Sequence, residues 1–214
     1  MKEEEKMGEK TDLRVSRTEK MLRDAFIEMM EDIGFKNITI EALTKKAYIS
    51  RKTFYLHYLD KYDLLDKLEE NVINGVGEII QPLPAMIQRG NYILGEEVNN
   101  QYIKLYQFFY DNSRLINLLN DEKNDPEFMD KIAKKIRSNV KTGYPEGTGN
   151  IPGKYFESLF SSTNAGVIRA WYASNMQETP VELAGITSRI VQGILDSLIL
   201  SNKEYAADSS KTEN

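Results

Sequence analysis

The sequence predicts an all-α protein in which a small N-terminal helix-turn-helix head precedes a larger helical body. Apolar residues recur at helical spacing along most of the chain, and helix N-cap signals are dense between residues 39 and 63. No segment shows a convincing strand pattern. We expect a flexible arm at residues 1–12, the head at 13–60, the helical body at 61–204 and a disordered tail at 205–214.

The first helix is predicted to begin just after the charged arm. Ser16 and Glu19 have the spacing of a capping box, in which each side chain satisfies a free backbone N–H. Leu22 and Phe26 then begin an apolar face. Gly34 stands where the helix should end, because glycine readily adopts a positive φ.

Three further helix starts follow within twenty-odd residues. Thr39, Ser50 and Asp60 are the expected N-caps, since their side-chain oxygens can accept hydrogen bonds from the first turn of a helix. Such closely spaced caps predict short helices with fixed entry angles, as a helix-turn-helix requires. Apolar staples should accompany the caps. The pairs are Ile38 with Leu43, Ile49 with Phe54, and Leu59 with Leu64.

The remaining chain also reads as helices. A long one should run from Lys61 to about Ile80, before two prolines. The last helix should begin with Thr179 as N-cap, Pro180 in its first position and Glu182 as the box partner. The helices expected between them cover about residues 92–110, 113–120, 126–140 and 154–175, with a Gly- and Pro-rich loop at 141–153.

Charge is distributed unevenly along the chain. The net charge is −5, but residues 13–62 contain ten basic and seven acidic residues and therefore carry +3. Residues 42–59 contain four basic residues and no acidic one. A basic head on an acidic body indicates local contact with phosphate rather than general polyanion binding.

The third helix has two chemically different faces. Phe54 and Tyr58 should point inward, while Arg51, Lys52 and Tyr55 should share the outer face. Arginine can form two hydrogen bonds with guanine in the major groove, and lysine can bind a base or a phosphate. The pattern therefore predicts a recognition helix for double-stranded DNA.

Residues 16–65 resemble the tetracycline-repressor (TetR) family. The resemblance is carried by Gly34-Phe35, Ile38 to Ile40, Ala47 to Ser50, Thr53 to Tyr55, His57-Tyr58 and Asp60-Lys61, followed by Asp63 to Leu65. More loosely, residues 166–171 with Thr179-Pro180 resemble a C-terminal type found in Firmicutes members of the family.

The resemblance implies a homodimer formed through the last two helices and a palindromic operator. It also implies a body that binds a small-molecule effector and thereby releases a repressed operator. The operator, the effector and the regulated genes are not encoded in these patterns. The candidate DNA-binding residues are Thr39, Ser50, Arg51, Lys52, Thr53, Tyr55, His57 and Lys61.

Several alternatives stay open at this stage. Tyr55 can pack, His57 can be structural, Lys61 can be a solvated charge, and the aromatic stripe Tyr102, Tyr106, Phe109 and Tyr110 can be core or pocket. At the level of function, an activator or a co-regulator switched by a protein partner fits the same fold. A helical interaction module without a DNA role is a further alternative.

Other classes of function are disfavoured by composition. The chain has no cysteine and one histidine, so it lacks thiolate ligands, disulfides, a cysteine nucleophile and a histidine-rich metal site. We therefore expect neither an enzyme nor a bound cofactor or metal. No apolar run approaches the ~20 residues that span a membrane, and the charged N-terminus does not resemble a signal peptide. These features predict a cytoplasmic protein without membrane contact.

Overall fold

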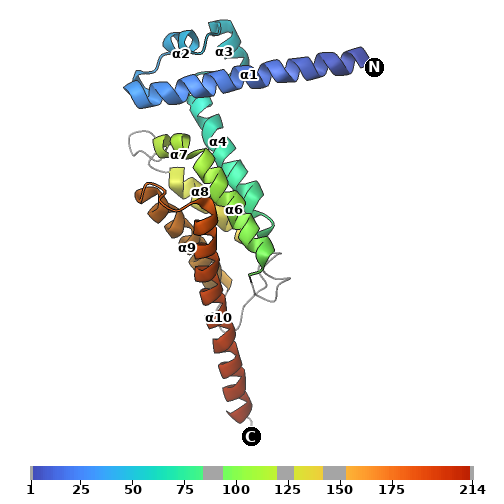
Figure 1. The fold of residues 1–214 in the computed structure, drawn as a ribbon, viewed down its shortest axis with the longest axis vertical. Helices are drawn as coiled ribbons and strands as arrows, with labels where there is room; N and C mark the ends of the chain where they lie inside the picture. Colours follow the sequence, from blue (N-terminus) through green and yellow to red (C-terminus); the bar gives the residue numbers. More distant parts are fainter. Residues whose placement is uncertain (1, 84–93, 120–127, 142–152, 213–214) are drawn as a thin grey trace. The chain divides into compact units, whose positions relative to one another are not determined.

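The structure, a computed structural model, describes residues 2–83, 94–119, 128–141 and 153–212. Every regular element in these ranges is a helix, which confirms the all-α class (Figure 1). The chain packs as two compact units, of which unit 1 comprises residues 1–72 and 114–128 and unit 2 comprises residues 73–113 and 129–214. The boundary between the units falls after residue 72, within the continuous helix α4, so residue 60, the expected domain boundary, lies inside unit 1.

The helices have the following bounds. Unit 1 contains α1 (Lys2–Ile33), the 3-10 helix η1 (Phe35–Asn37), α2 (Ile40–Lys46), α3 (Arg51–His57), the first part of α4 (Lys61–Ile80) and most of α7 (Ser113–Leu119). Unit 2 contains the rest of α4, α6 (Glu96–Asp111), most of α8 (Phe128–Lys141), α9 (Gly153–Ala173) and α10 (Pro180–Thr212). Pro126 and residues 142–152 of the expected loop lie outside the described residues. No helix in the described ranges is long and apolar enough to cross a membrane.

Helix α1 is longer than the sequence analysis predicted. It includes residues 2–12, which we expected to be a flexible arm, so Ser16 lies within the helix and does not cap it. Composition explains the difference, because the Lys and Glu residues that dominate this segment are strong helix formers even without an apolar face. At the other end, Gly34 has φ 75° and ψ 153°, a conformation essentially restricted to glycine. The positive φ expected at Gly34 is therefore confirmed.

The predicted caps of α2 and α3 are confirmed. The Thr39 hydroxyl accepts a hydrogen bond from the Ala42 N–H at 3.2 Å, and the Ser50 hydroxyl accepts one from the Thr53 N–H at 3.0 Å. Helix α2 packs against α1, and α3 packs against α2 (Figure 1). Because each cap fixes the residue at which its helix begins, the side chains that α3 exposes are set locally.

The start of α4 is fixed by hydrogen bonds. Asp60 accepts hydrogen bonds from the N–H groups of Tyr62 and Asp63 at 2.8 and 2.9 Å, as an N-cap should. Asp63 in turn accepts a hydrogen bond from the Leu59 N–H at 2.8 Å, which lowers the pKa of Asp63 below its usual value. The expected Leu59–Leu64 staple is wrong, because Leu59 is 82% exposed while Leu64 is fully buried. The hydrogen bonds fix this turn without apolar packing.

The turn between α2 and α3 contains a tyrosine in the left-handed region. Tyr48 has φ 54°, and its N–H donates to the Lys45 carbonyl at 3.2 Å. The next N–H, from Ile49, donates to the Thr44 carbonyl at 3.0 Å. These two bonds form a Schellman motif, whose left-handed position is usually occupied by glycine. The Tyr48 side chain is 89% exposed, so backbone hydrogen bonds, not side-chain packing, maintain this turn.

The core of unit 2 lies where α10 packs along α6 (Figure 1). Tyr102, Tyr106 and Phe109 of α6 are fully buried, so most of the aromatic stripe is core rather than pocket. The Tyr106 hydroxyl lies 2.6 Å from the Thr187 hydroxyl of α10. The Trp171 indole N–H donates to the Glu178 carbonyl at 2.9 Å. The buried polar atoms of Tyr106 and Trp171 therefore have hydrogen-bond partners, as a stable core requires.

Helix α10 begins as predicted and ends later than predicted. The N–H of Thr179 donates to the Glu182 carboxylate at 2.8 Å, and the N–H of Glu182 donates to the Thr179 hydroxyl at 3.3 Å. The first of these bonds is the main reason why the pKa of Glu182 lies below its usual value. The expected disordered tail is helical as far as Thr212. No Gly or Pro interrupts residues 194–212. Each further residue therefore extends an already nucleated helix at a low cost in free energy.

Candidate nucleic-acid interface

Helix α3 separates an apolar face from a cationic face, as the sequence predicted. Phe54 is fully buried and Tyr58 is 8% exposed, with ring centroids 5.7 Å apart. Arg51 and Lys52 are exposed, and Tyr55 is 52% exposed. The inner residues therefore anchor the helix, which leaves a positive face available for a partner.

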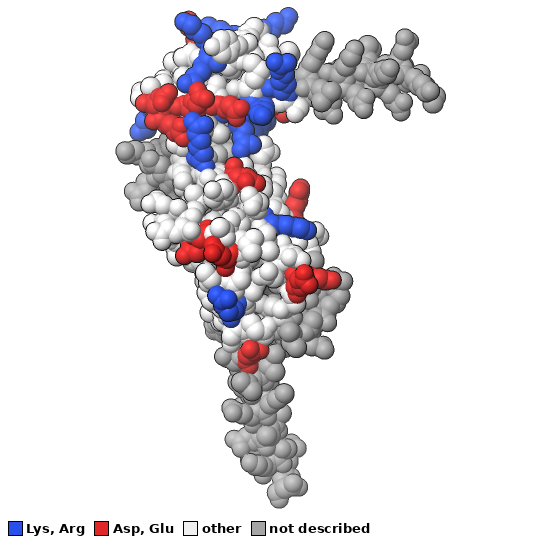
Figure 2. All heavy atoms as spheres, viewed as in Figure 1, with Lys and Arg blue, Asp and Glu red and all other residues white. Residues whose placement is uncertain are grey.

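The basic residues of the acid-free segment do not all serve that face. Lys46 lies 2.9 Å from Glu28 and 3.6 Å from Asp32, so its charge is already neutralised by α1. Among the described residues, Lys45, Arg51 and Lys52 form no ion pair and are exposed. Lys and Arg side chains gather over α2 and α3 (Figure 2). The unpaired charges of Lys45, Arg51 and Lys52 are suited to phosphate and base edges.

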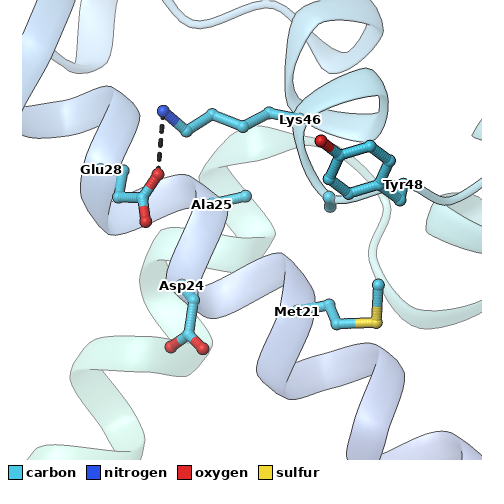
Figure 3. Close-up of a pocket in the computed structure, with 7 residues that line it drawn as sticks. Met21, Asp24, Ala25, Glu28, Lys46 and Tyr48 are labelled. Atoms are coloured by element: carbon cyan, nitrogen blue, oxygen red, sulfur yellow. Dashed lines mark ion pairs between the residues drawn. The ribbon is translucent and has the colours of Figure 1, made fainter.

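A surface cavity of about 470 Å³ lies on the α1 side of α2. Asp24 and Glu28 of α1 line it together with Lys46 and the exposed Tyr48 ring (Figure 3). Lys46 and Glu28, which form an ion pair, both line this cavity. Carboxylates repel phosphate, so the cavity does not extend the cationic face of α3.

Two hydroxyl groups among the predicted contacts cap helices, and a third pairs with one of them. Thr39 and Ser50 accept backbone hydrogen bonds, and the Ser50 and Thr53 hydroxyls lie 2.8 Å apart. Accepting a hydrogen bond uses an oxygen lone pair and leaves the hydroxyl hydrogen available for donation. Thr39 can therefore donate to a phosphate while it caps α2, and one hydrogen of the Ser50–Thr53 pair stays available in the same way.

His57 is oriented toward α1. Its side chain is only 13% exposed, and its Nδ1 lies 3.5 Å from the Glu19 carboxylate. This geometry favours a link between α3 and α1 over the phosphate contact expected from the sequence. The single histidine is thus placed at the packing side of the head.

Lys61, expected from the sequence to contact phosphate, has partners within the head. Its ammonium group donates to the carbonyls of Phe35, Lys36 and Ile38 at 3.1, 3.0 and 3.0 Å. It also lies 4.8 Å from the centre of the Phe35 ring. An ammonium group has three hydrogens, so these carbonyls use its full donor capacity. Lys61 fastens the start of α4 to η1.

Two exposed residues of the head were missed by the sequence analysis. Leu56 is 75% exposed and lies one helical turn beyond Lys52, on the outer face of α3. Lys45 is the exposed cation at the end of α2. Helical spacing from Lys52 was a sufficient signal for Leu56, because residues four apart share a face.

Comparison with known proteins agrees with this geometry. Residues 96–193 match the family described as "Transcriptional regulator C-terminal region" of TetR-type proteins. Over 128 residues the chain is 30% identical to the HTH-type transcriptional regulator YxbF of Bacillus subtilis (strain 168), covering 59% of this chain and 32% of the relative. The chain thus spans about a third of the length of that curated relative.

Solved structures share the fold at low identity. A TetR transcriptional regulator from Streptococcus agalactiae 2603V is similar with a TM-score of 0.55 and 20% identity, over 86% of this chain and 98% of that one. The dihydroxyacetone kinase operon activator DhaS is similar with a TM-score of 0.50 and 15% identity, over 84% of this chain and 96% of that one. The fatty acid degradation regulator FadR from Bacillus halodurans is similar with a TM-score of 0.51 and 12% identity, over 82% of this chain and 95% of that one.

These findings define the class of protein. The fold is that of helical transcriptional regulators, and the similar proteins named above are described as regulators. Residues 96–193 match the C-terminal region of TetR-family transcriptional regulators, and the fold of the chain is that of a TetR regulator. Regulators of this family bind DNA and act as dimers.

Proposed function

We propose that the protein is an operator-binding repressor whose α3 helix enters the major groove of double-stranded DNA. The observation that carries the proposal is the exposed, unpaired pair Arg51 and Lys52 on the face opposite the fully buried Phe54. Arg51 is suited to a guanine edge, and Lys52 to a base or a phosphate. The Tyr55 hydroxyl and ring add contacts on the same face.

Contacts with the DNA backbone would come from groups that retain a free hydrogen. The hydroxyls of Thr39, Ser50 and Thr53 meet this condition in the cap geometry described above. His57 and Lys61 leave the proposed contact set, because both are directed toward partners within the head. The refined set is therefore Thr39, Ser50, Arg51, Lys52, Thr53 and Tyr55.

A homodimer would present two such heads to successive major grooves about 34 Å apart and would require a near-palindromic operator. An apolar ridge on α10 supports α9 and α10 as the dimer interface. Ile190 is 41% exposed, and Ile186 and Ile194, four residues to either side, are partly exposed. A Cβ added at Gly166 of α9 or Gly185 of α10 would meet no atom within 4 Å. These sites leave room for close approach by a second chain.

Replacing Ile190 with lysine is expected to shift the purified protein from dimer to monomer at micromolar concentration, because a charge would be buried in the interface. Sedimentation velocity measures the change. The control is Ile33→Lys, since Ile33 has a similar exposure of 45% but lies on α1. A dimer that persists in Ile190→Lys would remove α10 from the proposed interface.

Regulation would require a ligand that binds the DNA-incompetent state more tightly than the DNA-bound state. Helix α4 contributes residues to both units, so it offers a covalent route from the body to the head. We propose a small-molecule effector that binds the body and releases the operator. The alternative is an activator or a protein-switched co-regulator, and DhaS, which shares the fold, is itself described as an activator.

The function is tested first by incubating the purified protein with fragmented genomic DNA and sequencing the retained fragments. We expect a near-palindromic site whose affinity falls steeply with salt, because phosphate contacts release counterions. Transcript levels after gene deletion then separate the two roles: a rise in neighbouring transcripts indicates repression, and a fall indicates activation. If no sequence is enriched at near-physiological salt, the proposed operator-binding function is wrong.

A further inference from the structure

The outer face of α3 carries an apolar side chain among its polar and cationic ones. Leu56 is 75% exposed, whereas Phe54, two residues earlier, is fully buried. Two residues correspond to roughly 200° of helix rotation, so these side chains point in nearly opposite directions. Leu56 therefore contributes nothing comparable to the packing that anchors α3, and its surface is available to a partner.

The neighbours of Leu56 indicate what that partner must offer. Lys52 precedes it by one helical turn on the same exposed face, and Arg51 and Tyr55 complete that face. Lys52 lies near the middle of this face by helical rotation, with Tyr55 on one side and Leu56 on the other. A surface that receives Lys52 and Arg51 must therefore also meet Leu56.

We propose that Leu56 contacts the C5 methyl group of a thymine in the major groove. The inference rests on the proposed DNA-binding function and adds a specificity-determining residue to it. The edges of base pairs in the major groove present hydrogen-bond donors, acceptors and the thymine methyl group, which is their apolar feature. Leucine has no donor or acceptor, so it favours an A·T pair at the position that it meets.

Helix geometry also limits where this pair lies. Leu56 is one turn beyond Lys52, or about 5–6 Å along the helix. Successive base pairs are about 3.4 Å apart. If α3 runs along the groove, the thymine lies roughly one to two base pairs from the group that Lys52 contacts. Each half-site of a palindrome should contain this thymine at the same place.

The test replaces each thymine of the recovered operator, one at a time, with deoxyuridine, which removes the methyl group and preserves base pairing. We expect the affinity of the wild type to fall about 3- to 10-fold when the substituted thymine is the one at this position of either half-site, because a small apolar contact is lost. Leu56→Ala should lose a similar factor on the thymine operator and should be insensitive to deoxyuridine at that position. Its unfolding midpoint should be unchanged, because the side chain is exposed.

Leu59 provides a matched control, since it is 82% exposed but lies beyond the end of α3. Leu59→Ala should keep the full response to deoxyuridine. A wild type that responds to no deoxyuridine, or a Leu56→Ala variant that responds as the wild type does, would overturn the inference while leaving operator binding intact. Absence of any sequence-specific binding by the wild type would overturn the inference and the proposed function together.

Discussion

Replacing Phe54 with alanine is expected to lower the free energy of unfolding by about 3–5 kcal/mol, the cost of truncating a buried aromatic side chain. Phe54 is fully buried and its ring packs beside Tyr58. Its loss would leave a cavity behind α3, so the helix would no longer be held in one orientation. Urea denaturation followed by circular dichroism measures the change in stability. Operator binding should fall with it, because the cationic face depends on this anchor.

The control for Phe54→Ala lies on the opposite face of the same helix. Leu56→Ala removes an apolar side chain that is 75% exposed and should change the free energy of unfolding by no more than about 0.5 kcal/mol. Phe54→Leu, which largely keeps the apolar volume, should cost about 1.5 kcal/mol or less. Equal stability of Phe54→Ala and the wild type would contradict the inward orientation of Phe54.

Replacing Lys61 with methionine is expected to lower the free energy of unfolding by about 2–3 kcal/mol, because hydrogen bonds to a charged group are lost. The ammonium group donates to the carbonyls of Phe35, Lys36 and Ile38. Lysine in the first turn of a helix is also disfavoured by the helix dipole, which these carbonyl contacts offset. Denaturation in the absence of DNA measures the effect directly.

The same variant separates two roles for Lys61. If its main role were a phosphate contact, Lys61→Met would leave the free energy of unfolding unchanged. It would instead reduce the slope of the logarithm of the DNA-binding constant against the logarithm of salt concentration by about one. Lys61→Arg should restore only part of the stability, because a planar guanidinium does not place three donors as an ammonium does. Lys36→Met is the control, since Lys36 is exposed and only its backbone carbonyl takes part.

Helix starts and the faces of α3 could be predicted because they depend on neighbouring residues. Thr39, Ser50 and Asp60 each accept hydrogen bonds from N–H groups two or three residues later. The inward Phe54 and the outward Lys52 follow from helical period alone. Residues 2–12 and 205–212 are helical although their sequence shows no apolar face, so the apolar period alone does not predict where α1 begins or α10 ends.

The sequence by itself determined the all-α class, the helix-turn-helix and the cationic face of its third helix, because caps and periodicity act over a few residues. Only the tertiary structure decided which polar side chains remain available. Lys61 reaches carbonyls 23 to 26 residues away, His57 faces Glu19, and Lys46 pairs with Glu28. These contacts join different helices, so they depend on how the helices pack, and no local pattern distinguishes a residue that binds its own chain from one that binds DNA.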